Sequence, residues 1–137
     1  MEILSVLDLF SKGKTEPAVD QKKWNKMWEL WSAGQAASPY AELMTYQSEI
    51  NNGGHWQYFF NVENTGGLRK EIAALDTVLP NELKKNLKRA YKAYLASEES
   101  GDDDAADEVM ERCDDVFYEQ ESDIERLLKE YAAKLEI

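Results

Sequence analysis

The stretch "EINNGGHWQYFFN", residues 49–61, sets two asparagines and two glycines directly before a histidine and four aromatic side chains. Asparagine and glycine adopt left-handed backbone angles at low cost, and a helix ending at Ile50 needs such residues to close its last turn. A second helix can begin at once, with Trp56, Phe59 and Phe60 facing the core. The stretch therefore predicts a tight corner between two helices.

The segments on both sides of this corner also have helical periodicity. Before it, Trp24, Trp28 and Trp31 repeat at spacings of four and three, which places them on one face of a helix. Such a stripe could form a groove for a partner, but an aromatic stripe of this kind more often packs into a core. Pro39 is suited to open the next helix, which ends at Ile50.

Four more helical segments follow the corner. Thr65 is a suitable N-cap for a helix that carries Leu68, Ile72 and Leu75 inward. Pro80 stands near the start of the next helix, and two further helices are expected over residues 102–119 and 122–137. No segment shows the sustained alternation of a strand.

This pattern predicts an all-α fold of about six helices. With 137 residues, the chain is long enough for one domain with a core, so residues 1–137 are expected to form a single bundle. The N-terminal helices of residues 1–35 should pack on the rest.

Composition places the chain among soluble globular proteins. It contains 43% hydrophobic residues and one cysteine, Cys113, so no internal disulfide can form. The first ten residues, "MEILSVLDLF", lack the basic start of a signal peptide, and no apolar run is long enough to span a membrane. We therefore expect a cytoplasmic protein.

The acidic residues are concentrated in one part of the chain. The net charge is -11, yet residues 98–125 contain fourteen acids and one base, Arg112, which gives -13 for this segment and +2 for the remainder. A surface of this sign repels nucleic acid and anionic membrane, and it attracts basic proteins.

A helix over residues 103–119 would separate these acids from its apolar side chains. At about 100° per residue, Val109, Met110, Cys113 and Phe117 share one side of the helix. The opposite side carries the residues that we predict to bind a partner: Asp103, Asp104, Asp107, Glu108, Glu111, Asp114, Asp115 and Glu119. The alternative is a solvated acidic surface with no dedicated role.

The corner stretch is also the first of three segments that carry a resemblance. The others are "TGGLRKEIAALDTVLP", which follows it, and "MERCDDVFYEQESDIERLLKEYAAK", near the end. Together they resemble a bacterial all-helical family of unknown function, typified by the Neisseria DNA-mimic protein nineteen, over about residues 40–137. For its mimic member, the resemblance implies a dimer whose acidic surface occupies the DNA-binding face of a transcription factor.

Catalytic and metal-binding chemistry has little support in the sequence. His55 is the only histidine, and we expect it to be structural, at a helix start or partly buried. No ligand spacing indicates a metal or a cofactor, and Cys113 should pack in the core. Lys84, Lys85, Lys88, Arg89 and Lys92 form a basic face that we expect to balance the acids within the chain or across a dimer.

The leading hypothesis is thus a non-catalytic DNA mimic that binds a basic DNA-binding protein, either a transcription factor or a nucleoid protein. An immunity-type inhibitor of a basic toxin or nuclease would use the same acids. An enzyme centred on His55 and the glycine corner, and an acidic helical domain without a mimic role, complete the alternatives. The residues leave open whether the protein is a monomer or a homodimer.

Overall fold

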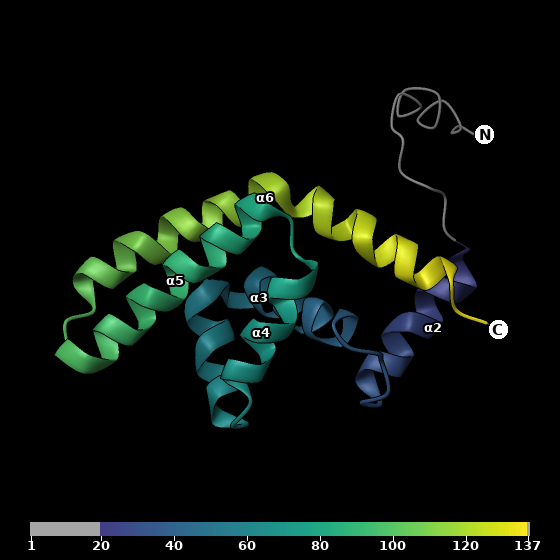
Figure 1. The fold of residues 1–137 in the computed structure, drawn as a ribbon, viewed down its shortest axis with the longest axis horizontal. Coiled ribbons are helices and arrows are strands. Elements are labelled where there is room, and N and C mark those ends of the chain that lie inside the picture. Colours follow the sequence, from purple (N-terminus) through teal and green to yellow (C-terminus); the bar gives the residue numbers. More distant parts are fainter. Residues whose placement is uncertain (1–19, 137) are drawn as a thin grey trace.

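A computed structural model describes residues 20–136, and within this range the chain forms five helices and no strand. The helices, labelled in Figure 1, are α2 (Gln21–Ser32), α3 (Tyr40–Asn64), α4 (Leu68–Val78), α5 (Asn81–Ser100) and α6 (Asp104–Ala133). The all-α expectation is confirmed. The part of the predicted N-terminal helices that falls on residues 1–19, and the segment "MEILSVLDLF", lie outside the described residues.

Helix α6 runs along the whole molecule (Figure 1). Its first half lies beside α5, and it also packs against α3 and, near its C-terminal end, against α2. The prediction of two helices here was wrong: the segment between Glu119 and Ile124 contains no Gly or Pro, and the buried stripe passes from Phe117 to Ile124 without a break in helical spacing. Nothing in the sequence stops the helix, so it continues for 30 residues.

Helix α3 contains the predicted corner inside it. Gly53 and Gly54 have non-helical angles, and Gly54 has a φ of +79°, in the left-handed region that favours glycine. The first half of the helix continues through Asn51 and Asn52, since no residue other than glycine has a positive φ within residues 20–136. The corner is therefore confirmed, but the two glycines alone make it.

The second half of α3 turns a different face to the core than expected. His55, Tyr58, Phe59 and Val62 are buried, whereas Phe60 is 62% exposed. At about 100° per residue, position 60 lies on the far side of the helix from these four side chains. The prediction that Phe60 faces the core was wrong, and the same prediction for Phe59 is confirmed.

Thr65 ends α3 rather than beginning α4. Its hydroxyl donates to the carbonyl of Val62 at 2.7 Å, and α4 starts at Leu68 with Gly67 as N-cap. A threonine can satisfy backbone groups at either end of a helix, and the Gly66–Gly67 pair allows the chain to turn before the next one. The N-cap prediction for Thr65 was therefore wrong.

The core is centred on Tyr46. Its ring makes edge contacts with Tyr58, Phe117 and His55, with centroids 5.0, 5.4 and 5.5 Å apart respectively. Asp20 is the N-cap of α2, and its side chain accepts from the amide of Lys22 at 2.8 Å.

The predicted tryptophan stripe lies on α2. Trp24, Trp28 and Trp31 are each partly buried and pack against the core, as expected. No helix between residues 20 and 136 is both long and apolar enough to cross a membrane.

Candidate partner-binding face

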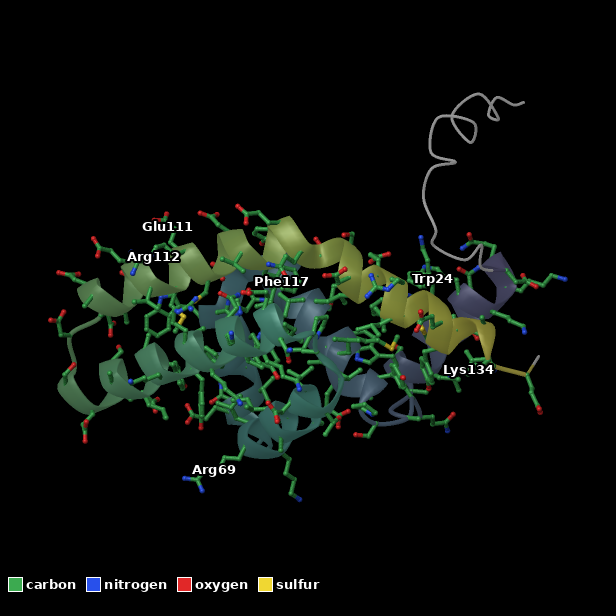
Figure 2. The ribbon with its side chains drawn as sticks, turned by 45° about the horizontal axis from the view of Figure 1, so that its top comes forward. Trp24, Arg69, Glu111, Arg112, Phe117 and Lys134 are labelled. Atoms are coloured by element: carbon green, nitrogen blue, oxygen red, sulfur yellow. The ribbon has the colours of Figure 1, made fainter. Side chains whose placement is uncertain are left out.

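The predicted acids line the first half of α6, on the side away from the bundle. We call this set the acidic face: Asp103, Asp104, Asp107, Glu108, Glu111, Asp114, Asp115 and Glu119. Seven of the eight are exposed, and Asp114 is the exception. Figure 2 shows Glu111 on the outer side of α6 and Phe117 on the side that faces the other helices.

The apolar side of the same helix fixes the acidic face in place. Ala106, Met110, Cys113 and Phe117 are at most 5% exposed and pack in the core against α5 and α3. Burial raises the pKa of the Cys113 thiol, while the nearby guanidinium of Arg89 lowers it. Cys113 is therefore a core residue, as predicted, and the helix that carries the acids is anchored over its whole first half.

Five carboxylates of the acidic face have no partner among the described residues. Within residues 20–136, the side chains of Asp104, Glu108, Glu111, Asp115 and Glu119 form no hydrogen bond, and no lysine or arginine lies within ion-pair distance of the face. The basic helix α5 does not neutralise them: its Lys88 pairs with Asp76 of α4 instead, at 3.1 Å. These carboxylates are therefore open to a partner.

Two members of the acidic face also hold neighbouring elements. Asp107 accepts from the indole N–H of Trp56 at 2.7 Å, which joins α6 to the second half of α3. Asp103 accepts from the hydroxyl of Ser97 and so closes the turn between α5 and α6. Both remain exposed, so they can still contribute charge to the face.

Asp114 has a different role from the one predicted. Only 26% of its side chain is exposed, and its Oδ1 accepts from the backbone N–H of His55 at 2.9 Å and lies 2.6 Å from the Nδ1 of the same residue. The sequence placed Asp114 among the acids by helical angle alone, and it could not show that the glycine corner turns His55 toward it. Asp114 therefore ties α6 to α3 more than it faces solvent.

His55 is fully buried between Asp114 and Tyr46. Its Nε2 lies 2.7 Å from the hydroxyl of Tyr46, and burial raises the pKa of that phenol well above its ordinary value. The phenol therefore stays protonated, and its O–H donates a hydrogen bond to Nε2 of His55. The proton of the imidazole is then on Nδ1, and this N–H donates to Asp114. Every polar group in the chain of three is then satisfied, as a structural histidine requires.

A second polar cluster, which the sequence did not reveal, joins α3 to α4. The hydroxyl of Tyr58 donates to Glu71 at 2.9 Å, and one carboxylate oxygen of Glu42 is buried with no partner in the described part of the chain. Burial raises the pKa of Glu71 to about 7; the Tyr58 hydrogen bond lowers it, and the charge of Glu42 raises it further. Helical spacing marks each of these residues only as polar, so no sequence signal brings them together.

The structure also contains a hollow beside Trp56 that the sequence did not predict. It lies against the acidic face and has a volume of about 410 Å³. Trp56 was expected to face the core, and it does so only in part, because its indole N–H reaches Asp107 at the surface. The two residues are 51 positions apart, so their contact depends on the fold.

The family described as DMP19-like protein matches residues 39–135, from the start of α3 to the end of α6. The chain belongs to this family. The match covers the three segments on which the resemblance rests, and it leaves α2 outside. No curated protein and no solved structure matches the chain. In this DMP19-like protein, the glycine corner of α3 and the acidic face of α6 thus lie in the part shared with the family.

Proposed function

We propose that this DMP19-like protein is a non-catalytic binding protein that mimics DNA. Its acidic face occupies the nucleic-acid-binding surface of a basic DNA-binding protein, a transcription factor or a nucleoid protein, in the cytoplasm. The observation that carries the proposal is the row of exposed carboxylates on a firmly packed helix, which have no partner within residues 20–136.

The spacing of these carboxylates suits the role. Asp104, Glu108, Glu111, Asp115 and Glu119 follow one another at three or four residues, so neighbouring charges are separated by about 4.5–6 Å along the helix axis. This repeat is broadly similar to the separation of successive phosphates along one DNA strand. A protein surface that binds such phosphates with lysine and arginine has the charges that the acidic face needs.

The energetic cost of the arrangement also favours a dedicated role. Like charges at i and i+4 destabilise a helix by about 0.2–0.5 kcal/mol per pair, and the acidic face contains five such pairs, of which Glu111 and Asp115 form one. The total, about 1–2.5 kcal/mol, is large beside a typical stability of about 5–15 kcal/mol. Solubility alone would be served as well by a surface of mixed charge.

We propose no catalytic role because the ring of His55 is already held by structural hydrogen bonds. Both ring nitrogens have partners at 2.6 and 2.7 Å, and the side chain is fully buried. A general base must reach the proton that it removes, and this imidazole is hydrogen-bonded to Tyr46 and Asp114 and packed against Phe59 and Phe117.

Charge reversal tests the proposal. The variant carrying Glu108→Lys, Glu111→Lys and Asp115→Lys should fold, since these side chains are exposed and make no hydrogen bond within residues 20–136. In a pull-down from a lysate of the source organism, the wild type should retain a basic DNA-binding protein and the variant should lose at least 90% of it. Retention should also fall steeply with salt, because exposed charges are screened within about 8 Å at physiological ionic strength.

The matched control is Glu29→Lys, Glu130→Lys and Glu136→Lys. It changes the net charge by the same amount, but Glu29 lies on α2, Glu130 lies near the C-terminal end of α6 and Glu136 follows that helix, and all three side chains are exposed. It should retain the partner as the wild type does. Equal retention by both triple variants would show that the acidic face is not the site. A retained toxin or nuclease, in place of a transcription factor or nucleoid protein, would instead support the immunity-type alternative.

A further inference from the structure

The hollow beside Trp56 lies between the second half of α3 and the first half of α6. Its volume of about 410 Å³ falls within the range of about 300–1,000 Å³ that is usual for ligand pockets. Two apolar side chains and four carboxylates line it: Trp56, Met110, Asp107, Glu108, Glu111 and Asp114. It is therefore a shallow, open depression with one aromatic wall on the acidic face, which is otherwise a convex helix surface.

The indole of Trp56 is held rigidly. Its N–H donates to Asp107 at 2.7 Å, and its ring makes an edge contact with Tyr94, with centroids 6.0 Å apart and an interplanar angle of 69°. The ring is only partly buried, so it also borders the hollow. A wall that is already fixed costs little ordering entropy when a ligand group enters.

The charged groups around the hollow are all carboxylates, so they favour a cationic ligand. Asp107 and Asp114 accept from Trp56 and His55, while Glu108 and Glu111 have no partner in the described part of the chain. No lysine or arginine within residues 20–136 comes within ion-pair distance of these four carboxylates. Residues 20–136 therefore leave this negative charge without a neutralising lysine or arginine.

We propose that this hollow is an anchor site for one arginine side chain of the basic partner. A guanidinium is planar, so it can lie against the indole of Trp56 while its N–H groups donate to Glu108 and Glu111. A lysine ammonium presents no such plane and forms fewer directed hydrogen bonds. The inference rests on the proposed function and adds to it a preference for arginine over lysine, which a row of exposed carboxylates alone does not provide.

The test uses two synthetic probes, an arginine nonapeptide and a lysine nonapeptide, titrated into the full chain by isothermal calorimetry at about 0.15 M salt. The wild type should bind the arginine peptide about fivefold more tightly than the lysine peptide. Trp56→Leu should reduce this ratio to near one and leave the lysine affinity within twofold. Trp56→Phe, which keeps an aromatic ring without the indole N–H, should keep most of the preference. This second variant shows whether the loss in Trp56→Leu comes from the missing ring or from a folding defect.

Trp24→Leu is the matched control, because Trp24 is also partly buried but lies on α2, at the other end of the molecule (Figure 2). It should keep the wild-type ratio. If Trp56→Leu keeps the ratio, or if the wild type binds both peptides equally, the anchor site is wrong.

The charge-reversal variant at Glu108, Glu111 and Asp115 separates this failure from that of the proposed function. If this variant binds neither peptide and the wild type binds both peptides equally well, the acidic face is supported and the anchor site is wrong. If it binds both peptides as well as the wild type does, the acidic face itself is wrong, and the anchor falls with it. Failure of the wild type to bind either peptide contradicts both.

Discussion

His55 joins three parts of the fold through its backbone and its ring. The backbone N–H and Nδ1 meet Asp114 of α6, and Nε2 meets Tyr46 in the first half of α3. The residue therefore holds the two halves of the broken helix together and fixes α6 over them. Sequence reasoning predicted a structural histidine but not its partners, because they lie nine and 59 positions away in the chain.

This role predicts a particular pattern of stabilities. His55→Phe keeps an aromatic ring but leaves the buried Tyr46 hydroxyl without a partner, so the free energy of unfolding should fall by about 2–4 kcal/mol. Adding Tyr46→Phe removes the unpaired hydroxyl and should restore at least half of this loss. Urea denaturation of the wild type, both single variants and the double variant measures the coupling. Additive losses in the double variant would mean that the ring's shape, and not its hydrogen bonds, is what matters.

Glu71 makes stability depend on pH. Its pKa in the folded protein is about 7, above the ordinary value of 4.5, so the folded state binds this proton more tightly than the unfolded chain does. The stabilisation is fully present below about pH 4.5 and is lost as the pH rises through 7. Glu71→Gln keeps an acceptor for Tyr58 without the charge. At pH 8 it should therefore be more stable than the wild type, by about 1–2 kcal/mol after allowance for solvent screening.

Denaturation at pH 5, 6.5 and 8 would measure this difference, with Glu29→Gln on the exposed side of α2 as the control. The gap between wild type and Glu71→Gln should widen as the pH rises, and the control should follow the wild type. A gap that stays constant over this range would contradict the raised pKa.

At the scale of the helices, the break in α3 depends on Gly54. Its φ of +79° strains any other residue, and a methyl group there would overlap the carboxylate of Asp114. Gly34 has a similar φ of +75°, but a methyl group there would meet nothing within 4 Å. Gly54→Ala should therefore cost about 1–2 kcal/mol more than Gly34→Ala. Chemical denaturation of both variants isolates the contact with α6, and equal losses would show that only the backbone angle counts.

The helices show where sequence periodicity succeeds and where it fails. Apolar spacing placed α2, α5 and the buried sides of α4 and of the first half of α3 correctly, because a core-facing stripe repeats with the helix itself; in the second half of α3 it failed for Phe60. Helix ends were predicted less accurately: Thr65 has the chemistry of an N-cap, yet its hydroxyl donates back to the carbonyl of Val62. The acid-rich segment at 119–123 reads like a break between helices, but without Gly or Pro it does not interrupt α6.

At the scale of the whole molecule, the sequence already shows how unevenly the charge is distributed. The segment 98–125 carries a charge of -13, compared with -11 for the whole chain, and half of its fourteen acids are exposed on the acidic face. Seven of the eight predicted members of the acidic face are exposed, and only Asp114 turns inward. The hollow beside Trp56 could not be predicted, because its walls come from two helices whose contact is set by the glycine corner.

The central claim is that the acidic face takes the place of DNA on its partner. The most direct measurement is competition: the partner retained by the wild type is bound to labelled duplex DNA, and the protein is added while the DNA-bound fraction is followed by fluorescence anisotropy. The wild type and the Glu29/Glu130/Glu136 control should displace the DNA, and the Glu108/Glu111/Asp115 charge-reversal variant should not. A ternary complex, in which the partner binds the wild-type protein and DNA at the same time, would contradict the account.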